Sequence, residues 1–173
     1  MIVRIKEFIS SPDQLMSING ELKDQKSSYD IDNFDIVFPI QYEGNIFKLD
    51  EDLLLDLCIK YKYNTQCDRC LVPMVSEVSS SFKIYFAKDI NEKEDEATIE
   101  YISLPEDDIF LDDLIISQVI TSKPLKQLCG DDCEGLCPQC GQNLNEEPCD
   151  CGNKVDVDLR FEQLLNLFNN EEV

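Results

Sequence analysis

The sequence predicts an α+β protein built on an antiparallel, β-rich domain, either barrel-like or a meander, with a long hairpin that carries cysteines at its tip. Long stretches alternate apolar and polar residues with a period of two, which is typical of half-buried strands. Six of the nine cysteines lie between positions 129 and 151, which indicates a zinc-ribbon-like tail. We therefore expect a β-rich domain at 1–124 with a helix near 109–122, and a cysteine-rich tail at 125–173 that ends in a short helix.

Composition limits both the location and the chemistry of the protein. The 173 residues are 43% hydrophobic, and no apolar run resembles a signal peptide or reaches the ~18 residues of a membrane span. We expect a cytoplasmic protein. The chain has no histidine, which removes the commonest general base and every mixed Cys/His zinc site. Its net charge of −21 opposes binding to bare nucleic acid and favours a basic partner, although acidity also simply maintains solubility.

In the first part of the chain the pattern predicts short strands separated by polar segments. The opening residues 2–6 indicate a strand, and residues 10–33 indicate a polar loop with one helical turn. Residues 36–42 place Ile, Phe, Ile and Tyr at every second position, which predicts a half-buried strand. We expect a turn at Glu43-Gly44-Asn45 and then a short strand through residues 47–49.

The clearest alternation runs from Leu53 to Tyr63 and leads directly into Cys67-Asp68-Arg69-Cys70. Residues 74–86 predict the returning strand, so this cysteine pair lies at the exposed tip of a long hairpin. Metal binding would explain why two cysteines occur at an exposed hairpin tip. Cys58 lies alone inside the alternation, and we interpret it as a small apolar residue without a role in metal binding.

The second part of the chain predicts a loop, a short strand and two helices. Residues 88–97 are highly charged and indicate a loop, and residues 98–103 indicate a short strand. Asp107-Asp108 begin a helix with acidic residues in its first turn, and Lys123-Pro124 end it. Residues 158–168 carry apolar residues at i, i+3, i+4 and i+7, which predicts an amphipathic C-terminal helix.

With Cys58 set aside, eight cysteines remain, and eight thiolates make two tetrahedral Zn²⁺ sites. Cytoplasmic cysteine pairs are metal ligands more often than disulfides, although disulfides and isolated thiols remain alternatives. Sites of four cysteines are closed and structural, because a catalytic zinc keeps an open position for water. Local spacing groups Cys137, Cys140, Cys149 and Cys151 as the first site, in which the tight C-x-C half leaves open whether both of its cysteines serve. The second site then comprises Cys67, Cys70, Cys129 and Cys133.

Three segments together resemble a known family. CDRCL (67–71), KPLKQLCGDDCEGLCPQCGQNLNEEPCDC (123–151) and DLRFEQLLNL (158–167) are similar to the cysteine-rich version of the YceD family of large ribosomal RNA subunit accumulation proteins. The resemblance implies a non-enzymatic bacterial ribosome biogenesis factor that acts near ribosomal proteins. Family members often carry lysines between the tail cysteines, whereas this chain has Gly130, Asp131, Asp132 and Glu134, which speaks against RNA contact by this loop.

Three functional hypotheses follow. The first is a zinc-stabilised acidic adaptor that binds a basic ribosomal protein or a pre-ribosomal large subunit. The second is direct binding of rRNA through the cysteine-rich tail, as zinc ribbons can do. The third is a thiol redox protein that uses Cys67 and Cys70, although a hairpin tip lacks the helix dipole that lowers the pKa of a reactive thiol.

Overall fold

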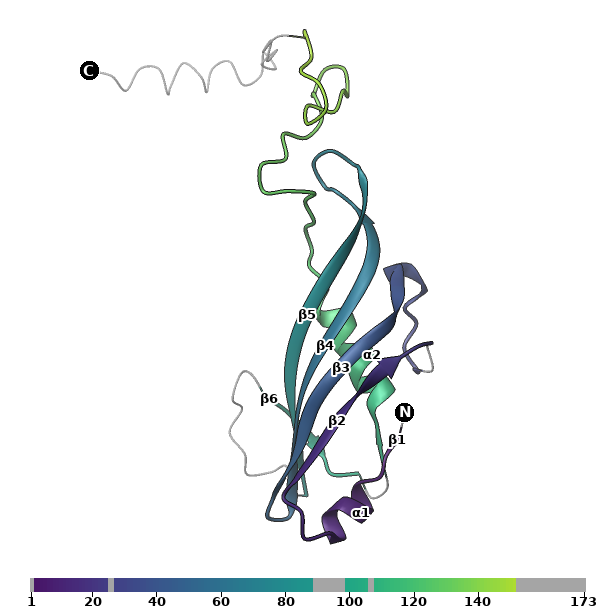
Figure 1. Ribbon diagram of the computed structural model, residues 1–173, viewed down its shortest axis with the longest axis vertical. Helices are drawn as coiled ribbons and strands as arrows, with labels where there is room; N and C mark the ends of the chain where they lie inside the picture. Colours follow the sequence, from purple (N-terminus) through teal and green to yellow (C-terminus); the bar gives the residue numbers. More distant parts are fainter. Residues whose placement is uncertain (1, 25–26, 89–98, 106–107, 152–173) are drawn as a thin grey trace, which may run out of the picture. The chain divides into compact units, whose positions relative to one another are not determined.

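The computed structural model describes residues 2–24, 27–88, 99–105 and 108–151 (Figure 1). These residues form two compact units. The sheet unit lies within residues 1–68 and 72–129, and the tail unit comprises residues 69–71 and the described residues from 130 onward. The predicted helix at 158–168 and all but the first residue of the predicted loop at 88–97 lie outside the described residues. The predicted domain division between 124 and 125 stays a prediction.

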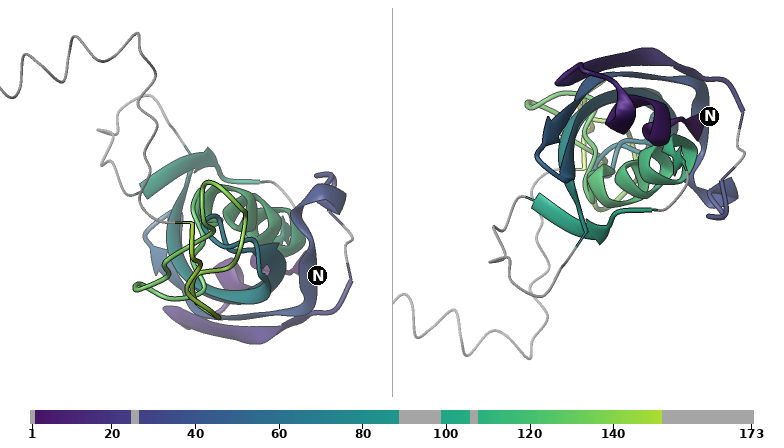
Figure 2. Two further views of the ribbon diagram at one scale, coloured as in Figure 1. Left: turned by 90° about the horizontal axis from the view of Figure 1, so that it is seen from above. Right: turned by 90° about the horizontal axis from the view of Figure 1, so that it is seen from below.

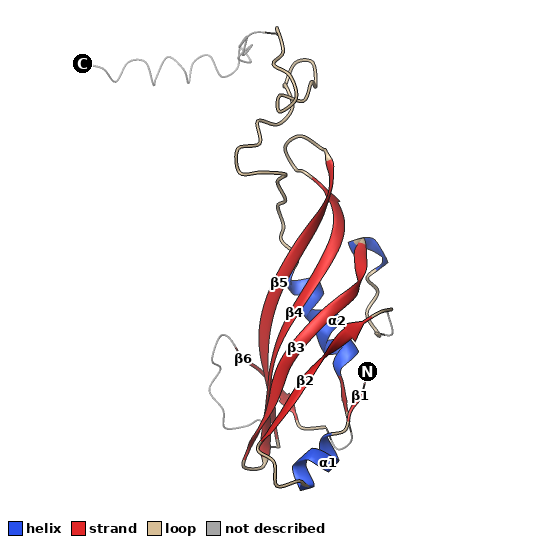
Figure 3. Ribbon diagram, in the orientation of Figure 1, coloured by secondary structure: helices blue, strands red, loops and turns tan. Residues whose placement is uncertain are grey.

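The sheet unit is built on a five-stranded sheet with the strand order β2-β3-β4-β5-β6 (Figure 3). Strands β2 to β5 form an antiparallel meander, and β6 runs parallel to β5, so the predicted α+β class with a mostly antiparallel sheet is confirmed. The other two strands, β1 and β7, form a small antiparallel pair. The elements are β1 Ile2–Val3, α1 Ile5–Ser10, β2 Leu15–Leu22, η1 Asp32–Phe34, β3 Ile36–Leu49, β4 Asp52–Gln66, β5 Pro73–Ala87, β6 Ile99–Ser103, β7 Ile109–Phe110 and α2 Leu111–Ser122.

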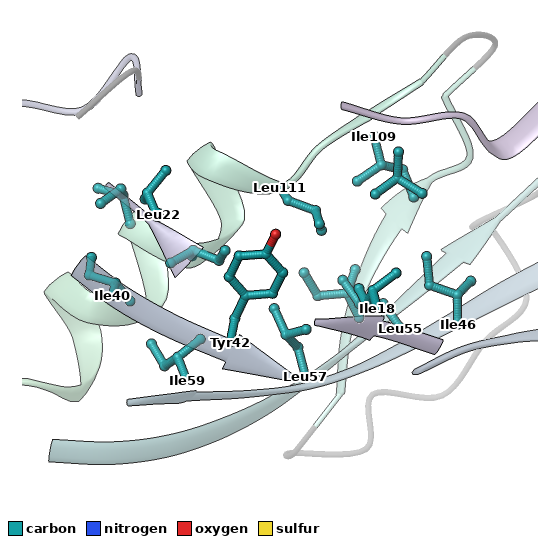
Figure 4. Close-up of a cluster of buried hydrophobic side chains, with 14 of the residues drawn as sticks. Ile18, Leu22, Ile40, Tyr42, Ile46, Leu55, Leu57, Ile59, Ile109 and Leu111 are labelled. Atoms are coloured by element: carbon teal, nitrogen blue, oxygen red, sulfur yellow. The ribbon is translucent and has the colours of Figure 1, made fainter. Parts of the chain in front are cut away.

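Strand β4 is the centre of the core. Every second residue from Leu53 to Tyr63 is buried, as the alternation predicts. Figure 4 shows side chains of β2, β3 and β4 meeting residues near the start of α2. At roughly 25 cal/mol per Å² of buried apolar surface, such a row of large side chains is a major stabilising contribution.

Helix α2 lies inside the curve of the sheet in both views of Figure 2. Its buried face includes Leu111, Ile115 and Val119, which confirms the helix predicted near 109–122. The helix begins at Leu111, directly after β7, and not at the predicted Asp107-Asp108. Two polar contacts accompany the apolar packing. The Tyr61 hydroxyl donates to the carbonyl of Val119 over 3.3 Å, and the Gln118 amide donates to the hydroxyl of Ser80 on β5 over 2.8 Å. These bonds fix the helix against β4 and β5.

The structure corrects three local predictions in the first part of the chain. The predicted opening strand is present as β1, although it is shorter than predicted. The opening strand ends at Val3 and the chain continues as α1, so Ile5 is buried on a helix. The predicted loop at 10–33 contains β2, whose inward positions Ile18 and Leu22 are buried against β3. The predicted turn around Gly44 does not exist, because β3 runs without a break to Leu49.

Gly44 is needed in β3 because another backbone comes very close. It lies opposite Leu57 of β4, and a Cβ added there would lie 2.9 Å from the Leu57 Cα and closer still to the carbonyl oxygen of Asp56. A glycine inside a strand usually marks such a close approach, and only the absence of a side chain permits it.

The predicted long hairpin is confirmed. β4 and β5 pair continuously from Leu53 opposite Phe86 to Gln66 opposite Pro73, and the turn between them contains Cys67 and Cys70. Among the described residues, no helix is both long and apolar enough to span a lipid bilayer.

We predict that Gly44→Ala destabilises the protein by about 2–3 kcal/mol, because the new methyl group would force β3 away from β4. Gly130→Ala is the control, because the Cβ added there would meet only the flexible end of the Asp132 side chain, at 3.0 Å. Urea unfolding followed by circular dichroism measures both variants. Equal midpoints for Gly44→Ala and the wild-type protein would contradict the close packing of β3 on β4.

Candidate metal centre

The hairpin turn, residues 67–72, positions the first cysteine pair. The Cys67 N–H donates to the carbonyl of Val72 over 3.0 Å and closes the turn directly after β4 ends. Cys67 and Cys70 are both buried. The prediction that these thiols are exposed at the tip is therefore wrong.

The tail turn, residues 137–142, repeats the same geometry. The Cys137 N–H donates to the carbonyl of Gln142 over 2.8 Å, which is again a bond from the first residue to the sixth. The Gly141 N–H also donates to the carbonyl of Cys137 over 2.9 Å. Gly141 has φ +74°, a left-handed backbone that glycine adopts without strain. The Cys-Pro-Gln-Cys-Gly sequence thus forms a compact turn that brings Cys137 and Cys140 together.

Hydrogen bonds from side chains hold the rest of the tail unit. The Asn145 carbonyl oxygen accepts the backbone N–H of Glu134 over 2.8 Å, and the Asn145 amide lies 3.5 Å from the Cys133 sulfur. The Arg69 guanidinium donates to the carbonyl of Cys133 over 2.9 Å. Gly135, at φ +81°, lies directly against the Arg69 backbone. Cys133 is therefore fixed from both sides by polar contacts rather than by apolar packing.

Within the sheet unit, a second set of contacts fixes the chain just before Cys129. Asp68 and Gln127 exchange hydrogen bonds: the Asp68 N–H donates to the Gln127 carbonyl over 2.8 Å, and the Gln127 N–H donates to the Asp68 carboxylate over 2.5 Å. The Ser76 hydroxyl on β5 donates to the Gln127 side chain over 2.8 Å. Cys129 follows two residues later.

The thiols gather in the two predicted sets. In each set the four sulfur atoms lie within 4.8 Å of one another. An ideal tetrahedral zinc site with Zn–S bonds of about 2.3 Å has sulfur atoms about 3.8 Å apart, so both sets fit such an ion after a small contraction. Two groups of four cysteines could thus hold metal ions, while the ligand role of each residue stays a prediction. The sets are Cys67, Cys70, Cys129 and Cys133, and Cys137, Cys140, Cys149 and Cys151.

The thiols of the second set differ widely in pKa. Backbone N–H groups of Cys140 and Gln139, together with the Cys149 thiol, lower the pKa of Cys137 to about 6. The hydrogen bond with the Cys140 thiol and the loss of solvation raise the pKa of Cys151 to about 12. One thiolate therefore forms easily and makes the next harder to form, since like charges in one site repel. A divalent cation removes that repulsion, and its binding releases the remaining thiol protons.

Cys58 belongs to neither set, and its lack of a metal-binding role stays a prediction. It is half-buried, its sulfur lies 3.8 Å from the Ser79 hydroxyl, and it points away from the buried face of β4.

The sequence analysis missed the supporting residues of both sets. Arg69 bonds the Cys133 carbonyl, Asp68 and Gln127 bond each other beside Cys67 and Cys129, and Asn145 bonds the Glu134 backbone. The contacts of Arg69 and of Asp68 with Gln127 join residues that are far apart in the chain. For Asn145 a weak signal existed, because an Asn-x-Asn segment directly follows the tail turn and such side chains bond nearby backbone groups. For the others, residue type and spacing gave no signal.

We predict that the purified protein carries two zinc ions per chain and that Cys137→Ser lowers this number to one, because three thiolates hold the ion more weakly than four. Cys58→Ser is the matched control and should keep both ions. Elemental analysis of freshly purified protein, together with native mass spectrometry, gives the numbers. A Cys137→Ser protein that retains the full wild-type zinc content would refute the second site as drawn.

Comparison with known proteins identifies the family of the chain. The family described as "Large ribosomal RNA subunit accumulation protein YceD" matches residues 55–168, a range that includes all eight clustered cysteines. Proteins of Mycobacterium bovis and Mycobacterium tuberculosis, each described as an uncharacterized protein, are 32% identical over 112 residues, 61% of this chain. The chain spans about half the length of these curated relatives, since the matched part is 51% of each. No solved structure matches the chain. The chain belongs to the YceD family of large ribosomal RNA subunit accumulation proteins.

Proposed function

We propose that this protein is a non-enzymatic factor of ribosome biogenesis that supports accumulation of the large-subunit rRNA in the cytoplasm. It acts as an acidic adaptor, stabilised by two structural Zn²⁺ ions, for a basic ribosomal protein or a pre-ribosomal large subunit. The family description supports the rRNA role. The adaptor role depends on the surface of the tail unit.

The observation that carries the proposal is the charge of the tail unit. Its described residues include one basic side chain, that of Arg69, whose guanidinium bonds the Cys133 carbonyl. The acidic residues are all exposed: Asp131, Asp132, Glu134, Glu146, Glu147 and Asp150. An ion bound by four thiolates adds a net charge of −2. A surface of this kind attracts basic proteins and repels phosphates.

The same observations weigh on the two alternatives. Direct binding of rRNA needs several Lys or Arg side chains against phosphates, and the described part of the tail unit offers none beyond Arg69. A thiol redox role for Cys67 and Cys70 needs accessible sulfur, whereas both residues are buried. Four sulfur ligands also close a metal site, which favours a structural role over catalysis.

The test uses zinc-loaded protein and three purified probes: pre-ribosomal large-subunit particles, protein-free 23S rRNA, and large-subunit ribosomal proteins tested one at a time. We predict binding to the particles and to at least one basic ribosomal protein, and no binding to bare rRNA. Charge reversal by Asp131→Lys with Asp132→Lys should weaken binding by roughly tenfold, since exposed charge pairs contribute about 0.2–1 kcal/mol each. Co-sedimentation and surface plasmon resonance measure these affinities.

The control is Asp13→Lys with Asp24→Lys, which changes the net charge equally within the sheet unit and should leave the affinity within about twofold. Tight binding of bare rRNA, with a steep loss of affinity as salt increases, would replace the adaptor by the RNA-binding alternative. Absence of binding to all three probes would remove both.

A further inference from the structure

Leu71 occupies a backbone position that suits glycine. It is the fifth residue of the hairpin turn, as Gly141 is of the tail turn, and both turns are closed by the same bond from first to sixth residue. Leu71 has φ +58° and Gly141 has φ +74°. Glycine adopts this left-handed conformation freely, whereas a branched side chain crowds its own backbone there. The two turns therefore differ at the one position where a side chain is unfavourable.

The strain at Leu71 has no compensation from packing that the structure shows. The side chain is 56% exposed and does not belong to the buried core. Val72, the next residue, is 37% exposed. The chain thus combines a strained backbone with an aliphatic side chain in water, and both features work against folding. Strained positions of this kind are found where a side chain serves recognition or catalysis, and a leucine has no catalytic chemistry.

The surroundings define the kind of partner. Leu71 belongs to the tail unit, whose described acidic residues are all exposed: Asp131, Asp132, Glu134, Glu146, Glu147 and Asp150. Arg69 contributes one positive charge, and its guanidinium donates to the Cys133 carbonyl, so the carboxylates of the described tail unit outnumber its basic groups six to one. An apolar side chain on an acidic unit fits a basic surface that contains an apolar pocket. A second copy of this chain fits poorly, since two acidic units would repel each other.

We propose that Leu71 is the apolar anchor by which the tail unit docks into a hydrophobic pocket on a basic large-subunit ribosomal protein. This inference rests on the proposed adaptor function and adds the contact that gives it specificity. Electrostatic attraction alone brings any basic surface to the tail unit, whereas a buried leucine selects a surface with a matching pocket. The hairpin turn then serves to present Leu71 as well as to hold Cys67 and Cys70.

The test compares Leu71→Asn, Leu71→Gly and Leu125→Asn in zinc-loaded protein. Asn and Gly both tolerate a positive φ, so the turn is kept while the anchor is removed. Leu125, which is fully exposed in a coil of the sheet unit, is the matched control. The probe is each large-subunit ribosomal protein that binds the wild-type chain when tested singly. Each variant is also checked for zinc content and for its denaturation midpoint.

We expect both Leu71 variants to lose at least about tenfold in affinity, as is usual for an interface anchor, and Leu125→Asn to bind like the wild-type protein. Leu71→Gly should retain both zinc ions and unfold at the same or a higher denaturant concentration, because strain is removed.

Wild-type affinity in the Leu71 variants would overturn the anchor while leaving the adaptor function intact. A loss of zinc or stability in Leu71→Gly would overturn it too, by showing that Leu71 serves the fold. If the wild-type protein binds none of the ribosomal proteins, the adaptor function fails first. Dimerisation of the wild-type chain that Leu71→Asn abolishes would assign the anchor to a second copy instead.

Discussion

In its described residues the tail unit has no apolar core, and its cysteine thiols gather instead. None of the described residues beyond Ile120 belongs to the hydrophobic core. Between positions 130 and 151 the buried residues are Cys133, Gly135 and Cys137, which cannot bury enough apolar surface to offset the conformational entropy of the segment. Small domains of this kind depend on metal ions or disulfides. On the account proposed above, sulfur-bound metal ions supply the stability of the tail unit, and the acidic surface displayed by that unit depends on the same ions.

The sheet unit differs from the tail unit in that apolar packing stabilises it. The buried row of β4, the meander around it and helix α2 form a large apolar core. Strand length links this core to the cysteines: β4 and β5 continue in register to Gln66 and Pro73, so the hairpin turn begins where the strands stop pairing. The position of Cys67 therefore follows from a hydrophobic alternation that begins at Leu53.

The sequence was sufficient to predict features that depend on local periodicity. The hairpin, helix α2 and the grouping of the cysteines follow from period-two alternation, a helical stripe and the spacing of pairs. The sequence was insufficient where contacts between distant parts of the chain determine the local structure. Gly44 was interpreted as a turn residue, although its role is to admit a neighbouring backbone, and β2 was missed because its few apolar residues gain their burial from β3. Hydrogen bonds such as that of Arg69 to Cys133 join positions 64 residues apart, and no local pattern encodes them.

The most direct measurement of the central claim is amide hydrogen exchange before and after zinc is removed by a chelator, with the released metal quantified. The account predicts that amides bonded inside the tail unit, such as those of Cys137 and Leu144, lose their protection, while the paired amides of β3 and β4 keep theirs. If the amides of the tail unit remain protected in protein shown to be free of metal, the ions do not hold this unit together and the account is contradicted.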